Sequence, residues 1–134
     1  MSRKEDKKTL EKILLEIGGE KALILKDEPD FYNLLTRGVL FNKPSDYIIK
    51  GEMCQCHKNS VFLWESNKRK YRIVTGYALS STGLWHQHSW LIDKFNNIIE
   101  TTVKREKYYG YILTPLEAES FLWEYKKEET SCPS

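Results

Sequence analysis

The sequence predicts a single α+β domain, because the hydrophobic periodicity changes along the chain. Apolar residues recur at helical spacing near the start, the middle and the end, whereas apolar and polar residues alternate within 71–113. A length of 134 residues suits one hydrophobic core. We therefore expect a central helix packed on an antiparallel sheet of about four strands, with flanking N- and C-terminal helices.

The first helix is expected over 10–17, after a stretch, 1–8, that is expected to be disordered. Two glycines at 18–19 follow at the place where a helix commonly ends in the left-handed conformation. The apolar side chains of this helix recur at i, i+3, i+4 and i+7, at Leu10, Ile13, Leu14 and Ile17.

The segment 20–50 carries weaker signals, and its pattern indicates no function. Residues 22–25 suit either a strand or a helix, and 28–35 has helical spacing with Pro29 in its first turn. The polar stretch 41–46 is typical of a loop.

The central helix is expected to begin near Cys54 and to reach Glu65. Its buried face would hold Cys56, Ser60, Leu63 and Trp64. Alternation then predicts an antiparallel meander of four strands at 71–80, 84–93, 98–103 and 108–113.

A closing helix is expected to run from Thr114 to about Lys127. Thr114 and Glu117 have the spacing of a capping box, and Pro115 suits the first turn between them. The tail, 128–134, is expected to be disordered.

Charge and cysteine content exclude several classes of protein. A formal charge of +2 is far from the basic excess of most nucleic-acid-binding proteins, so nucleic acid is not an expected partner. Charged residues interrupt the apolar run 10–17, which predicts neither a signal peptide nor a membrane span. Three cysteines are too few for a disulfide framework, which favours a reducing, cytoplasmic location.

The reactive side chains gather in two short segments, 54–57 and 86–88. Together these hold two of the three cysteines and all three histidines. A thiol in the first turn of a helix lies near the positive end of the helix dipole, which can lower a thiol pKa from about 8.5 into the neutral range. His88, held on a strand, is the candidate base for such a nucleophile, whereas His57 and His86 are expected to be structural or to face a substrate.

The turn between the second and third expected strands decides whether an acid lies beside His88. A three-residue turn, 94–96, with Asn96 in the left-handed conformation would place Asp93 opposite Asn97. Trp90 would then face Glu100, and His88 would face Thr102, with Glu100 diagonal to His88. A two-residue turn would shift the register and move Glu100 to the other face of the sheet.

This order of residues resembles the papain-like cysteine hydrolases, and most closely their transglutaminase-like branch. The matching features are a cysteine at the start of a helix, the strand segment His88–Ser89–Trp90, and the acid Glu100 on the next strand, all within 52–102. The resemblance implies a thiol hydrolase or acyltransferase that acts on an amide or related acyl bond. Its substrate would be a peptide, a protein or a small amide, with no cofactor and no membrane partner.

The same resemblance assigns a role to each residue of a Cys-His-Glu triad. Cys56 would be the nucleophile, His88 the general base and acid, and Glu100 the group that orients the imidazole. Cys56 is preferred to Cys54 because Cys56 shares a helix face with Ser60 and Leu63. In the family a side chain just upstream commonly completes the oxyanion hole, and the candidates here are Asn42 and Asn59, because Gln55 points elsewhere.

Three other interpretations are open. The domain could be a catalytically inactive binding or adaptor domain of the same fold. Two cysteines and two histidines could form a tetrahedral zinc site, from Cys54, Cys56, His86 and His88. The basic segments 68–70 and 104–107 could also meet an acidic partner or nucleic acid, although such runs are usually solvated turns.

Overall fold

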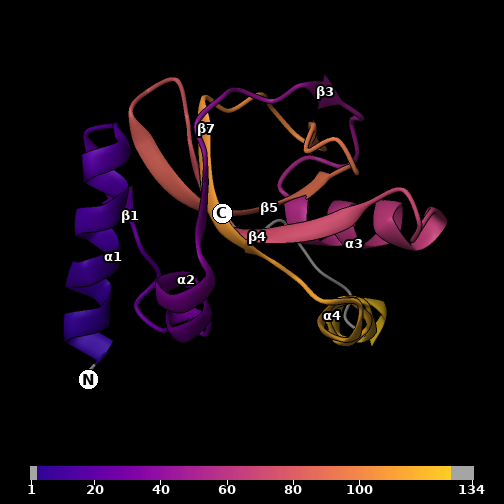
Figure 1. Ribbon diagram of the computed structural model, residues 1–134, viewed down its shortest axis with the longest axis horizontal. Helices are drawn as coiled ribbons and strands as arrows, with labels where there is room; N and C mark the ends of the chain where they lie inside the picture. The colour runs from indigo at the N-terminus through magenta and orange to yellow at the C-terminus, as the bar shows by residue number, and fades with distance from the viewer. Residues whose placement is uncertain (1–2, 128–134) are drawn as a thin grey trace. The chain divides into compact units, whose positions relative to one another are not determined.

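The computed structural model describes residues 3–127 and has an α+β fold (Figure 1). In this part of the chain four helices accompany a mixed, mostly antiparallel sheet of seven strands. In chain order the elements are α1 (Arg3–Ile17), β1 (Lys21–Leu23), α2 (Phe31–Arg37), β2 (Val39–Phe41), β3 (Tyr47–Ile48), α3 (Cys56–Ser66), β4 (Arg72–Leu79), β5 (Leu84–Ile92), β6 (Ile98–Glu100), β7 (Lys107–Ile112) and α4 (Pro115–Lys127). The α+β class is confirmed, but the sheet is larger than the expected four strands.

The sheet is not the expected meander. Its strand order is β2-β7-β4-β5-β6-β3, so β7 lies between β2 and β4 rather than beside β6. Strand β1 pairs with β5 and β3 pairs with β6, both in parallel, whereas β2 pairs with β7 and β5 with β6 in antiparallel orientation. The additional strands have only two or three residues, which is too short for an alternating pattern to reveal them.

The described residues divide into two compact units. Unit 1 comprises 3–44, 76–88 and 105–111, and unit 2 comprises 45–75, 89–104 and 112–127. Strands β4, β5 and β7 contribute residues to both units.

In unit 1, α1 packs against α2 and β1 (Figure 1). Its side chains Leu10 and Leu14 are fully buried. The expectation that 1–8 is disordered is wrong from residue 3 onward. Acidic side chains at Glu5 and Asp6 lie in the first turn, where the helix dipole favours negative charge. The helix therefore begins well before its first apolar residue.

Side chains from distant strands satisfy the carbonyl groups at the end of α1. Trp85 Nε1 donates to the carbonyl oxygen of Gly18 at 2.9 Å, and Lys107 Nζ donates to that of Ile17 at 3.2 Å. Gly19 follows with φ of 79°, and an added Cβ would lie 2.7 Å from a methyl carbon of Leu79. Both its backbone conformation and its close packing require glycine there.

In unit 2, α3 packs against α4. The capping box of α4 is confirmed, because the Glu117 amide donates to Thr114 Oγ1 at 3.2 Å and the Thr114 amide donates to Glu117 Oε1 at 2.8 Å. The largely apolar interior of this unit includes Val61, Trp64, Ile73, Trp90, Leu91, Ile92, Ile98, Ile99, Leu113 and Leu122. The tail predicted to be disordered lies outside the described residues.

Two element boundaries differ from the expectation. Helix α2 begins at Phe31 after the N-cap residue Asp30, so Pro29 precedes the helix instead of occupying its first turn. Strand β6 ends at Glu100 rather than at residue 103, because the Glu100 carboxylate accepts the amide hydrogens of Thr101 and Thr102. Those amides are therefore engaged locally.

Within 3–127, no helix is long and apolar enough to span a bilayer.

Candidate functional site

Cys56 is the first residue of α3, and its side chain is half-buried in unit 2. The N-cap residue Gln55 makes no side-chain capping bond, and Ser60, one turn further along, is fully buried. Cys56 keeps its thiol, whereas Cys54 is in a disulfide and has no thiol. Three cysteines are still too few for a disulfide framework, but a disulfide at Cys54 weakens the inference of a reducing, cytoplasmic location.

Glu100, the candidate acid, is a buried carboxylate at the end of β6, also in unit 2. Its Oε2 accepts the amides of Thr101 and Thr102 at 3.1 Å and the hydroxyl of Thr102 at 3.0 Å. Three donors on one oxygen suit a charged acceptor and hold the carboxyl group in one orientation. The sequence indicated an acid on this strand but not the turn that holds it.

The turn before β6 has the geometry expected from the sequence. Asn96 has φ of 61°, and the Asp93 amide donates to the carbonyl of Asn97 at 3.2 Å. The ladder pairs Leu91 with Ile99 and Ile92 with Ile98. The same register places Trp90 opposite Glu100, as expected for a three-residue turn.

His88 belongs to unit 1 and is 2% exposed on β5. Its ring centroid lies 6.4 Å from that of Tyr108 on β7. His86, on the same strand, has its pKa lowered by partial burial, by the Arg105 guanidinium and by His88. Because β6 ends at Glu100, the expected ladder pair of His88 with Thr102 does not form.

A second histidine forms a polar chain inside unit 2. His57 Nδ1 lies 2.5 Å from Ser89 Oγ, and Ser89 Oγ donates to Thr75 Oγ1 at 2.9 Å. The bond from Ser89 to Thr75 leaves Ser89 Oγ to accept from His57 Nδ1, which favours the tautomer with a proton on Nδ1. The His57 ring also contacts Phe121 and Tyr125 of α4.

The two candidate oxyanion-hole residues, Asn42 and Asn59, belong to different units. Asn59 is engaged by Glu52: its Nδ2 donates to the Glu52 carbonyl at 2.7 Å and its Oδ1 accepts the Glu52 amide at 3.1 Å. Asn42 belongs to unit 1. Gln55, directly before Cys56, is 8% exposed. Asn59 would have to give up two hydrogen bonds to serve as a donor.

The alternative zinc site loses one of its ligands. Cys54 cannot supply a thiolate while it is in a disulfide. Among residues 3–127, no three or more histidine, cysteine, aspartate or glutamate side chains are grouped to hold a metal ion. The set Cys54, Cys56, His86 and His88 therefore does not form the tetrahedral cluster that the spacing allowed.

Unit 1 contains a buried polar network that the sequence did not reveal. Tyr77 donates to Glu28 Oε1 at 2.7 Å, and the Asp30 amide donates to Glu28 Oε2 at 2.8 Å. Tyr111 on β7 donates to Asp30 Oδ1 at 2.8 Å. Glu28 precedes a proline in a segment without clear periodicity, so no sequence signal marked it as buried.

Two open cavities lie in unit 2. One, of about 380 Å³, is formed by the α3–β4 and β5–β6 turns, and the other, of about 300 Å³, runs along α3 beside 49–52. Cys56 lines neither of them.

Comparisons with models of known protein families, with curated proteins and with solved structures found no match.

Proposed function

We propose that the protein is a thiol hydrolase or acyltransferase that uses Cys56, His88 and Glu100. Cys56 gives its thiol proton to His88 and attacks the carbonyl carbon of an amide or related acyl group. For an amide, the carbon–nitrogen bond then breaks as His88 transfers that proton to the leaving amine. The resulting thioester is resolved by water or by an amine, with His88 accepting a proton from that nucleophile. Glu100 orients the imidazole, and no cofactor takes part.

The observation that carries this proposal is the position of the free thiol. Cys56 stands at the first position of an 11-residue helix whose N-cap side chain makes no capping bond. The N-terminal amide groups and dipole of such a helix stabilise a thiolate. The disulfide at Cys54 makes Cys56 the nucleophile of choice.

The β5–β6 turn gives further support. Its register places Trp90 opposite Glu100, and Trp90 lies two positions after His88 on β5. Side chains two positions apart share a face of a strand, so His88 and Trp90 project in the same direction from β5. The fixed, buried carboxylate of Glu100 has the character needed for a group that orients an imidazole.

Alkylation with iodoacetamide across pH tests the proposal without knowledge of the substrate. The rate at Cys56, followed by mass spectrometry, should reach half its maximum at a pH well below about 8.5, the value of an ordinary thiol. His88→Ala should move this midpoint upward or slow the reaction. Cys54→Ser should leave alkylation of Cys56 unchanged.

Matched variants separate a triad from a general loss of structure. His86→Ala removes a neighbouring histidine from the same strand and should not change the alkylation profile of Cys56. Glu100→Gln should act in the same direction as His88→Ala, whereas Glu124→Gln, on exposed α4 surface, should have no effect. A midpoint near 8.5 that ignores His88→Ala would contradict the proposal and favour an inactive binding domain.

A further inference from the structure

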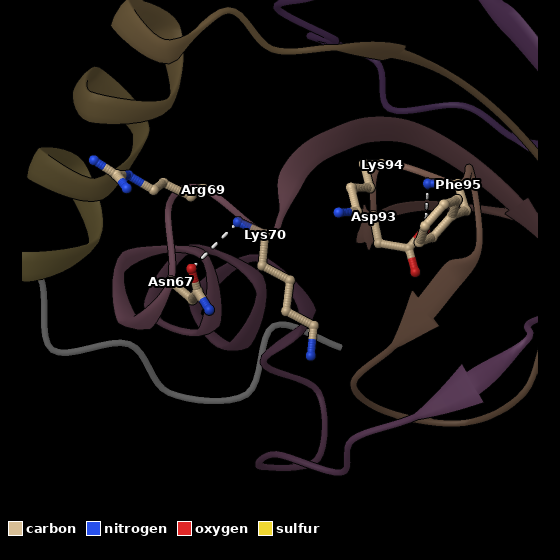
Figure 2. Close-up of a pocket in the computed structure, with 6 residues that line it drawn as sticks. All are labelled: Asn67, Arg69, Lys70, Asp93, Lys94 and Phe95. Atoms are coloured by element: carbon tan, nitrogen blue, oxygen red, sulfur yellow. Dashed lines mark hydrogen bonds between the residues drawn. The ribbon is translucent and has the colours of Figure 1, made fainter.

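The cavity between the α3–β4 turn and the β5–β6 turn has an unusual charge distribution. It is lined by Asn67, Arg69, Lys70, Asp93, Lys94 and Phe95, all in unit 2 (Figure 2). Its volume of about 380 Å³ is in the range of sites for small molecules. Three basic residues and one acidic residue thus line one opening.

The basic residues of this cavity differ from their neighbours in ion pairing. Lys68 pairs with Glu119 at 2.7 Å, and Lys126 pairs with Glu65 at 2.8 Å. In the part of the chain that the structure describes, Lys70 and Lys94 form no ion pair and lie instead 5.2 Å from the ring centroids of Tyr71 and Phe95. Like charges at one opening repel one another, and a bound anion would offset this repulsion.

The acidic residue at the cavity, Asp93, is hydrogen-bonded within the β5–β6 turn. Asp93 Oδ1 accepts the amides of Phe95 and Asn97 at 2.9 Å, and its Oδ2 accepts Asn97 Nδ2 at 3.0 Å. These bonds tie the carboxylate to the backbone of the β5–β6 turn. Its oxygens are therefore engaged by donors of the turn, and within residues 3–127 no ion pair joins it to Lys70 or Lys94.

The same bonds hold a large aromatic ring in solvent. Phe95 is 73% exposed at the tip of a turn that is fixed by Asp93 and by the left-handed Asn96. Figure 2 shows Lys70 between Asn67 on one side and the Asp93–Phe95 turn on the other, while the Arg69 guanidinium points away from them. An ordered, exposed ring beside unpaired ammonium groups combines a stacking surface with an anion site.

We propose that this cavity binds a small phosphate ester that carries an aromatic ring, of the nucleotide class. Its phosphate lies against Lys70 and Lys94, and its ring stacks on the open face of Phe95. The modest net charge of +2 and the limited volume favour a single nucleotide over a long nucleic acid. This site is independent of the proposed thiol chemistry.

The test is a titration with adenosine 5′-monophosphate followed by amide NMR shifts. Saturable shifts should be confined to the backbone amides of 67–70 and 93–97. Adenosine alone and inorganic phosphate alone should each bind at least about fivefold more weakly, since each lacks one of the two contacts. Cys56→Ser should bind as the wild type does.

Variants assign the binding to named side chains. Lys70→Ala, Lys94→Ala and Phe95→Leu should each weaken binding about fivefold or more, and added salt should weaken it further. Lys68→Ala removes an equal charge that is already paired with Glu119, and it should change the affinity less than twofold. Circular dichroism melting confirms that each variant is folded.

Three outcomes of the experiments with nucleotide, phosphate and variants would overturn the inference. They are amide shifts that lie elsewhere or do not saturate, an equal loss of affinity in Lys68→Ala and Lys70→Ala, and binding of inorganic phosphate as tight as that of the nucleotide. Tighter binding of a ten-nucleotide single strand would replace the small ligand with an extended nucleic acid, which also contradicts the proposal.

Discussion

The hydroxyl group of Tyr77 donates a 2.7 Å hydrogen bond to Oε1 of Glu28, a carboxylate that is only 1% exposed. The same hydroxyl accepts the Leu25 amide at 3.3 Å. A buried carboxylate is costly unless donors surround it, so Tyr77 on β4 stabilises the buried position of Glu28. The pair thereby joins the irregular segment before α2 to the sheet strand within unit 1.

Tyr77→Phe should destabilise the protein. The change leaves Glu28 Oε1 without its Tyr77 donor in a buried site, which typically costs about 1–3 kcal/mol of unfolding free energy. Urea denaturation followed by tryptophan fluorescence measures the loss. Tyr32→Phe is the control, because Tyr32 is 77% exposed and its change should be close to neutral. Equal stability of the two variants would show that the buried bond contributes little.

The same pair predicts a loss of stability in alkali. Burial, followed by the charge of Glu28 and the hydrogen bond to it, raises the pKa of Tyr77 well above its ordinary value of 10.0. Above pH 10 the unfolded chain releases this proton while the folded chain retains it, so the contribution of Tyr77 is complete below pH 10 and declines as the pH rises. Unfolding free energies measured from pH 8 to 11 should decline less steeply in Tyr77→Phe. An unchanged slope would refute the assignment.

His86 predicts the opposite dependence in acid. Its partial burial, together with Arg105 and His88, lowers its pKa below 6.5. The unfolded chain therefore binds a proton more readily than the folded chain, and the contribution of His86 to stability is lost as the pH falls below 6.5. An NMR titration of the ring protons should give a His86 pKa below 6.5. His86→Gln should reduce the acid sensitivity of unfolding.

Asn96 should be replaceable only by residues that accept a positive φ. Its φ of 61° suits asparagine and glycine, whereas other side chains pay roughly 1–2 kcal/mol in the left-handed conformation. Asn96→Gly is therefore expected to be nearly neutral and Asn96→Val to be destabilising. Thermal melting compares them, and similar melting temperatures for the two variants would contradict the importance of this turn conformation.

Thr114→Ala should weaken the start of α4. It removes the acceptor for the Glu117 amide and leaves only one half of the capping box. Such a change typically costs about 1 kcal/mol. Chemical denaturation should show this loss, and Thr114→Ser should recover most of it because serine keeps the oxygen. If serine and alanine behave alike, the side-chain cap is not what stabilises this helix end.

Local signals predicted the hairpin and the capping box well. The β5–β6 turn depends on Asn96 and Asp93, which act within five residues, and the capping box depends on Thr114 and Glu117, which are three residues apart. Such motifs are complete in the sequence, because every partner lies close along the chain. The candidate nucleophile Cys56 was found in the same way, from its place at a helix start.

Long-range pairing was not predictable from these patterns. Strands β1 and β3 join the sheet in parallel over two or three residue pairs, and β7 lies beside β4 although β6 precedes it in the chain. Short strands carry too few residues for alternation, and the choice among several compatible neighbours depends on the whole set of packed elements.

The sequence by itself determined the α+β class, the three-residue turn, the cap of α4 and the concentration of cysteines and histidines at two points. Only the tertiary structure decided the strand order, the buried Glu28–Tyr77 bond and the cavity that brings Lys70 and Lys94 to one opening. The physical reason is range. Periodicity and capping act between near neighbours, whereas a buried carboxylate or a shared cavity depends on residues separated by tens of positions that meet only when the sheet forms.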